Sequence, residues 1–192
     1  MLTTLIELQR LKALERTGWM LRGIAQGAES VAAHSYGVAV AAMLLADEVV
    51  ARGVEVDTER VLRLALLHDW AEVRVGDLPR TASEYFGAEA RKRAERAAFN
   101  DLVRDAGEDA AARYKLLHEE YEERASLEAR LVKAADVVDL LVQTLAFERA
   151  GVRGLDEFWE GASAQDFRLE GVAAEVLKDV LCALFEARRN LK

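Results

Sequence analysis

The apolar segment 61–67 is followed directly by three ionisable side chains: His68, Asp69 and Glu72. A segment that is apolar almost all round is typical of a helix buried inside a protein. Burying ionisable groups costs several kcal/mol unless each is paired or bound to a metal ion. On a continuous helix, His68 and Glu72 lie on one face, one turn apart, with Asp69 beside them. The pattern therefore predicts half of a metal site, and other segments must supply the rest.

Two further ionisable residues are embedded in apolar segments. His34 lies in the first turns of segment 31–50, and Asp136 lies in the apolar face of a segment that starts at Ser126. An acidic group within an apolar face needs a partner. A lone histidine at the start of a buried helix is more often structural than a ligand, so its meaning depends on the other residues. Asp139, three residues beyond Asp136, either orients a ligand or reaches the surface.

Together, four residues form a mixed set of imidazoles and carboxylates: His34, His68, Asp69 and Asp136. Such a set suits one divalent metal ion (Mn, Co, Ni, Fe or Zn), with open positions for water and substrate. The third histidine of the chain, His118, has no surroundings typical of a ligand, and we interpret it as exposed or structural.

Another group of residues suits a substrate that carries a phosphate and a base. Arg16 and Arg22 flank Trp19, and arginine forks onto phosphate oxygens while an indole offers a stacking face. In the alternative interpretation, Trp19 anchors the core and both arginines are solvated. Lys133 is a third candidate for neutralising a phosphate. The Arg-Lys-Arg run at 91–93 is predicted to be a solvated helix face.

The elements that must position these residues are helices, because the chain has a single proline and no segment that alternates like a strand. Helical patterns cover 2–16, 31–50, 57–72, 88–106, 109–125, a segment from Ser126, a short helix within 152–166, and 169–190. We predict an all-α fold of one domain over residues 1–192, with a core of roughly 1–150 and a C-terminal helical extension over 151–192.

The composition excludes several classes of partner. The net charge of −8 makes nucleic acid a poor partner. The single cysteine, Cys182, allows no internal disulfide and fits a reducing compartment. The N-terminal segment has no secretory core, and the apolar run 37–46 is shorter than the roughly 18 residues that span a bilayer. We therefore expect a cytoplasmic protein with no membrane and no nucleic-acid partner.

The chain resembles the HD-domain metal-dependent phosphohydrolases, in particular their 5′-deoxynucleotidase branch, in four stretches: 29–35 (ESVAAHS), 66–72 (LLHDWAE), 75–79 (VGDLP) and 131–136 (LVKAAD). The resemblance covers roughly residues 1–150. It implies a helical bundle with a metal site between central helices, a single divalent metal, and removal of the 5′-phosphate from deoxyribonucleoside monophosphates. It also implies that homodimers are common.

The resemblance further implies that Glu72 and Asp77 are needed for catalysis, and that Trp19 with Arg16 or Arg22 shapes the substrate pocket. As a mechanism, Glu72 orients or deprotonates the attacking water, while Asp77 positions the sugar hydroxyl or assists the leaving 5′-oxygen. Two alternatives stay open. One is an HD hydrolase that acts on deoxynucleoside triphosphates or alarmone nucleotides. The other is a non-catalytic protein that binds a metal ion and a nucleotide.

Overall fold

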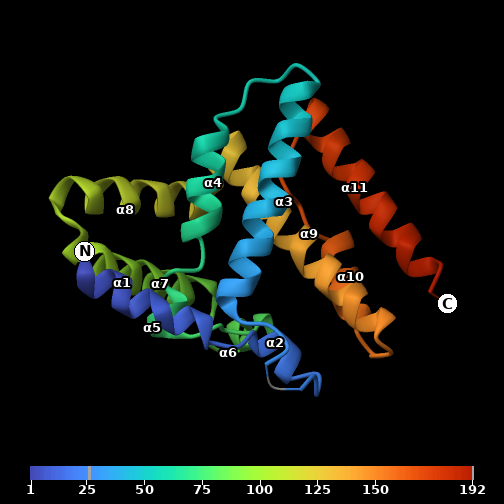
Figure 1. The fold of residues 1–192 in the computed structure, drawn as a ribbon, viewed down its shortest axis with the longest axis horizontal. Helices are drawn as coiled ribbons and strands as arrows, with labels where there is room; N and C mark the ends of the chain where they lie inside the picture. The colour runs from blue at the N-terminus through green and yellow to red at the C-terminus, as the bar shows by residue number, and fades with distance from the viewer. Residues whose placement is uncertain (26, 192) are drawn as a thin grey trace. The chain divides into compact units, whose positions relative to one another are not determined.

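The structure is a computed structural model that describes residues 1–25 and 27–191, with the side chains at 80, 83 and 84 left undescribed. Within these residues the regular elements are α-helices and short 3₁₀-helices, numbered along the chain in Figure 1. No strand occurs in the described part of the chain, apart from an isolated antiparallel bridge between Glu15 and Ser30. The all-α prediction is therefore confirmed.

The chain forms two compact units, each built from two stretches of sequence. The first unit comprises Met1–Ser35 and Leu67–Glu123, and the second comprises Tyr36–Leu66 and Arg124–Lys192. Helix α3 (Val31–Ala51) contributes residues to both units, and α4 (Thr58–Leu67) ends with the first residue of the later stretch of unit one. We describe each unit separately, and the prediction of a single domain stays a prediction.

The first unit is assembled around a small buried cluster of apolar side chains. Its other elements are α1 (Leu2–Leu8), η1 (Gln9–Lys12), α2 (Thr17–Met20), α5 (Glu72–Val75), η2 (Arg80–Ala82), α6 (Ser83–Phe86), α7 (Ala88–Leu102), η3 (Val103–Ala106) and α8 (Glu108–Glu123). The cluster consists of Leu11, Val31, Val73 and Leu102, with Trp70 packed against it. Helix α7 contacts both α5 and α8, so it lies beside the segment that follows the His68–Asp69 pair.

The second unit contains the remainder of α3 and α4 together with α9 (Leu127–Arg149), α10 (Asp156–Ser163) and α11 (Gly171–Arg189). Ser126 caps α9, because its Oγ accepts a hydrogen bond from the backbone N–H of Ala129 at 3.0 Å. Helix α9 packs against α10 and α11. Their shared core contains Leu141, Leu145 and Trp159.

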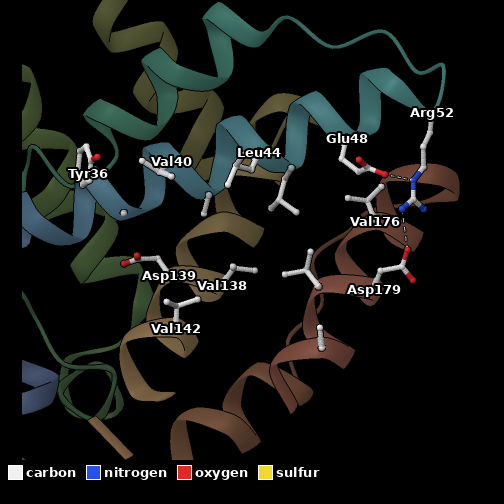
Figure 2. A pocket seen from close by; sticks show the side chains of 15 residues that line it. Tyr36, Val40, Leu44, Glu48, Arg52, Val138, Asp139, Val142, Val176 and Asp179 are labelled. Carbon is white, nitrogen blue, oxygen red and sulfur yellow. Dashed lines mark hydrogen bonds and ion pairs between the residues drawn. The ribbon is translucent and has the colours of Figure 1, made fainter. Parts of the chain in front are cut away.

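A groove of about 720 Å³ lies within the second unit, lined mainly by apolar side chains of α3, α9 and α11 (Figure 2). Its one arginine, Arg52, donates to Glu48 at 2.8 Å through Nε and to Asp179 at 3.1 Å. Two carboxylates therefore already offset this positive charge. The groove is a poor place for a phosphate ester, and the chemistry suggested by the sequence must be sought elsewhere.

The helix predicted over 57–72 is shorter in the structure, because α4 ends at Leu67. A tight turn follows, in which Trp70 N–H donates to Leu67 O at 3.1 Å and Glu72 N–H donates to Asp69 O at 3.0 Å. These i→i+3 bonds wind the backbone more tightly than an α-helix. His68 and Glu72 therefore do not share one continuous helix, and the prediction that they lie on the same helical face was wrong.

The helix predicted over 2–16 is also divided, into α1 and η1. Beyond these elements the backbone bends to meet the segment before α3. Val31 N–H donates to Leu14 O at 2.8 Å, and Arg16 N–H donates to Glu29 O at 3.1 Å. These long-range bonds leave residues 14–16 extended, and no apolar periodicity encodes such bonds.

Helix α3 agrees with the helix predicted over 31–50 to within one residue. Among the described helices it is the one that is long and apolar enough to cross a membrane, with an 18-residue window of mean hydropathy 1.3. Central helices of water-soluble proteins pass the same test, and 44% of this window is buried within the protein. The observation is therefore weak evidence for a membrane span.

Candidate active site

His34, His68 and Asp69 come together inside the first unit. His34 lies in the first turn of α3, where Ser30 Oγ accepts the backbone N–H of Ala33 at 3.2 Å. The side chains of His34 and His68 are each 1% exposed, and Nε2 of each imidazole faces Oδ2 of Asp69, at 3.7 Å and 3.1 Å respectively. Two imidazole nitrogens and one carboxylate oxygen therefore converge on a single buried point.

This donor set fits a divalent metal ion. Oδ2 of Asp69 is buried and accepts no well-formed hydrogen bond from a described residue. Burial opposes ionisation of Asp69, but the neighbouring positive charges, above all that of His68, outweigh it and hold the pKa of Asp69 well below its usual range. An ionised carboxylate beside two imidazoles is the ligand chemistry of first-row divalent ions.

Glu72 follows the turn, at the start of α5, and is 6% exposed. Its Oε2 is buried, and no described residue donates a hydrogen bond to it. The pKa of Glu72 is raised to about 10, first by burial and then by the negative charges of Asp69 and Asp77. Arg16 and Arg91 act in the opposite direction. A bound cation would likewise favour the ionised form of Glu72.

Asp77 is held in place by the segment that begins α2. Oδ1 of Asp77 accepts a hydrogen bond from Arg16 at 3.3 Å, and its Oδ2 accepts the backbone N–H of Thr17 at 2.5 Å. The hydroxyl of Thr17 donates to the carbonyl of Asp77 at 2.6 Å. The same nitrogen of Arg16 lies 3.6 Å from Oδ2 of Asp69. Arg16 therefore links the residue suited to metal binding with the turn that carries Asp77.

Trp19 lies in α2 and Arg22 follows this helix. Both were predicted from the sequence to line a substrate pocket. Trp19 is 2% exposed, and its indole N–H donates to Glu29 at 2.5 Å. Arg22 donates to the backbone carbonyl of Gly18 at 3.2 Å. Trp19 is thus a buried anchor of this unit, and contact of either residue with substrate stays a prediction.

Asp136 and Lys133 lie in the second unit, on α9. Nζ of Lys133 contacts Oδ2 of Asp136 at 2.7 Å, with the two side chains 28% and 17% exposed. The carboxylate of Asp139, one turn further along α9, packs against the backbone of Gly37 on α3. A Cβ atom at position 37 would collide with this carboxylate. The assignment of Asp136 as the remaining metal ligand stays a prediction.

His118 was interpreted as exposed or structural, and the structure decides between the two. The residue is 2% exposed, and its ring stacks on Phe99 with the centroids 4.1 Å apart. Burial, and to a smaller extent the positive charge of Arg96, lowers the pKa of His118 to about 4. His118 is therefore a neutral core residue, which agrees with the structural alternative.

Arg91 is half-buried, although the sequence analysis interpreted it as part of a solvated run. Its Nε donates to Glu95 at 2.6 Å, and the two side chains are 32% and 12% exposed. Arg93, two residues on, is exposed as predicted. The i, i+4 spacing of Arg91 and Glu95 was a signal that could have separated Arg91 from its neighbours.

These features define a class of protein: an all-helical protein whose buried His-Asp cluster is suited to a divalent metal ion. The model of the HD domain family matches residues 8–165. The chain therefore belongs to the HD domain family, which confirms the resemblance seen in the sequence.

Curated relatives of known name were found along most of the chain. It is 35% identical to 5′-deoxynucleotidase HDDC2 of Homo sapiens over 139 residues. This match covers 72% of this chain and 64% of that protein. It is 32% identical over 179 residues to 5′-deoxynucleotidase hdd1 of Schizosaccharomyces pombe, covering 90% of this chain and 86% of that protein. The chain thus spans slightly less than two thirds of its human relative.

Solved structures agree with the family assignment. The crystal structure of PH0347 protein from Pyrococcus horikoshii OT3 is similar with a TM-score of 0.82 and 32% identity, covering 97% of this chain and 99% of that one. A "predicted metal-dependent phosphohydrolase" from Magnetospirillum magnetotacticum MS-1 is similar with a TM-score of 0.64 and 25% identity, covering 97% of this chain and 91% of that one. The expected fold class, an HD-domain helical fold, is confirmed.

Proposed function

We propose that this protein is a divalent-metal-dependent phosphomonoesterase that removes the 5′-phosphate from deoxyribonucleoside monophosphates. The observation that carries the proposal is the buried convergence of His34, His68 and Asp69, with Glu72 and Asp77 close by. The relatives named 5′-deoxynucleotidase support the choice of substrate.

In this proposal one ion of Mn, Co, Ni, Fe or Zn is held by His34, His68 and Asp69, with Asp136 of α9 as the fourth ligand. A bound divalent ion lowers the pKa of water and offsets the negative charge of a phosphate. The mixed nitrogen and oxygen donors, and the ionised state of Asp69, support this ligand set.

The residues around the ligands have separate roles in the proposal. Glu72 orients the attacking water and takes up its proton at a carboxylate oxygen, for which its buried Oε2 is available. Arg16 is held between Asp69 and Asp77, so it fixes the turn at Asp77 relative to the ligands. Asp77 then positions the sugar hydroxyl or assists departure of the 5′-oxygen.

The test is a product assay on protein that has been stripped of metal and reloaded with Mn or Co. We expect orthophosphate from deoxyribonucleoside monophosphates, and a loss of activity of about 100-fold or more in Glu72→Ala and Asp69→Ala. Unchanged orthophosphate release in both variants would overturn the proposal. Release of triphosphate or pyrophosphate would instead identify an HD hydrolase of another substrate class, and a melting shift with nucleotide but no turnover would identify a binding protein.

We further propose that both units belong to one HD domain, that the protein is a cytoplasmic homodimer, and that nucleic acid is not a partner. The family model spans residues of both units, which supports the single domain. The net charge of −8 and the exposed free thiol of Cys182 support the absence of nucleic-acid binding and the reducing compartment. Sedimentation should give twice the chain mass of 21.3 kDa, and a value of one chain mass would refute the dimer.

A further inference from the structure

A phosphate ester needs a cationic side chain with donors available to its oxygens, and the candidates from the sequence are already engaged. Arg16 contacts Asp69 and Asp77. Arg22 donates to a backbone carbonyl, and Lys133 pairs with the carboxylate of Asp136. Each of these cations would have to leave an existing partner in order to hold a phosphate.

Arg91 differs from these cations in the way its guanidinium is held. Its Nε donates to Glu95 at 2.6 Å, whereas its two terminal amino groups donate no hydrogen bond to any residue that the structure describes. The side chain is 32% exposed, so it is neither fully buried nor fully solvated. An arginine fixed through Nε presents its remaining donors in a rigid fork, which matches the geometry of phosphate oxygens.

Arg91 also lies within electrostatic range of the reacting groups. Helix α7, which carries it, packs against α5, which begins at Glu72. The charges of Arg91 and Glu72 act on each other in both directions, since each stabilises the ionised form of the other. The guanidinium is therefore near the carboxylate that the proposed reaction uses.

We propose that Arg91 binds the phosphate group of the substrate and that Glu95 positions it for this role. The inference rests on the proposed phosphomonoesterase function, because it assigns the phosphate contact of that same site. The short bond from Arg91 to Glu95 removes rotational freedom from the guanidinium before the substrate arrives. Less entropy is then lost when the phosphate is bound.

Arg91→Ala and Arg93→Ala form a matched pair of variants. Each removes one positive charge from α7, the first at a half-buried position and the second at an exposed position. Calorimetric titration with inorganic phosphate measures binding without any turnover. Steady-state kinetics with a deoxyribonucleoside monophosphate separate KM from kcat. Inhibition by the corresponding deoxynucleoside, which lacks the phosphate, reports on the rest of the pocket, and metal content is measured for each protein.

We expect Arg91→Ala to weaken phosphate binding and to raise KM at least tenfold, with unchanged deoxynucleoside inhibition and metal content. Arg91→Lys should lie between this variant and the parent, and Arg93→Ala should match the parent. Glu95→Gln should raise KM less than Arg91→Ala does. Phosphate binding within twofold of the parent in Arg91→Ala, or equal losses of deoxynucleoside and metal binding, would overturn the proposal.

If Arg91→Ala does not fold, Arg91→Gln removes the charge while keeping a side chain of similar length, and the same criteria apply to it. If the parent releases no orthophosphate from any monophosphate, the proposed function fails. The calorimetric comparison of parent, Arg91→Ala and Arg93→Ala still supports or refutes phosphate binding by Arg91.

Discussion

At the scale of single residues, the site combines ionisable groups whose environments push their pKa values apart. Asp69 is driven toward its ionised form by neighbouring cations, whereas Glu72 is driven toward its neutral form by burial and by the charges of two aspartates. In the proposed reaction these two carboxyl groups, three residues apart, have different tasks. Asp69 is an anionic ligand, and Glu72 accepts a proton once a bound cation favours its ionised form. Groups separated in this way are typical of catalytic sites.

This division of tasks predicts a specific phenotype for Glu72→Gln. We expect kcat to fall by about 10²–10⁴ because the amide cannot accept a proton, while metal content stays at the parent level because Glu72 is not a ligand. Metal analysis and steady-state kinetics on the same preparation test this. Glu89→Gln, an exposed change in the first turn of α7, is the control. Parallel loss of metal and activity would show that Glu72 acts as a ligand instead.

His118 gives a prediction about stability rather than activity. Its pKa is about 4 in the folded protein and about 6.5 in an unfolded chain. The unfolded state therefore takes up the proton first, and stability falls as the pH drops from about 6.5 to about 4. Over that window the parent should lose on the order of 1–3 kcal/mol more than His118→Phe, which keeps the ring contact with Phe99. Urea unfolding at several pH values measures the difference, and identical pH profiles would refute it.

At the scale of elements, the positions of the long helices followed from apolar periodicity and capping residues. The starts of α3 and α9, capped by Ser30 and Ser126, are examples. The turn at His68 was not predictable in this way, because its i→i+3 bonds break the period on which the argument rests. The sequence singled out Glu72 as an ionisable residue after an apolar run, but the position of its side chain depends on that turn, and its chemistry stays a prediction.

The half-buried position of Arg91 was not predictable for a different reason. Three consecutive basic residues at 91–93 look alike in sequence, and only packing of α7 on α5 distinguishes the half-buried Arg91 from the exposed Arg93. Tertiary contacts of this kind have no local signature. The buried histidines at 34 and 68 were easier to single out, since an ionisable group stands out within an apolar segment.

The approach of α9 to α3 within the second unit predicts the effect of Gly37→Ala. Alanine alone would favour the helix, but a Cβ at this position would run into the carboxylate of Asp139. We expect a net loss of about 1–3 kcal/mol in the free energy of unfolding. In an Asp139→Ala background the same change should be neutral or stabilising. Equal effects of Gly37→Ala in both backgrounds, measured by urea unfolding, would contradict the proposed clash.

At the scale of the whole molecule, the proposed ligands belong to both compact units: His34, His68 and Asp69 to the first and Asp136 to the second. A ligand that binds only the folded state stabilises it in proportion to the logarithm of its concentration. A metal ion that is bound only by the folded protein should therefore raise its free energy of unfolding.

We expect Mn or Co at about 100 times its dissociation constant to stabilise the stripped protein by roughly 2.7 kcal/mol, seen as a rise in Tm. The rise should disappear in His68→Ala and be reduced in Asp136→Asn. Asp179→Asn, a change at the exposed carboxylate beside Arg52, should leave it intact. An undiminished rise in Asp136→Asn would remove this residue from the ligand set.

The contact of Lys133 with Asp136, 2.7 Å between nitrogen and oxygen, has one more consequence. If Asp136 is a ligand as proposed, a bound ion would compete electrostatically with the ammonium group of Lys133 for this carboxylate, so we expect metal loading to weaken the ion pair. Covalent labelling of that amine by an acylating reagent should then proceed at different rates in stripped and loaded protein. Peptide mass spectrometry of Lys133 would thereby report occupancy of the ion site without any substrate being present.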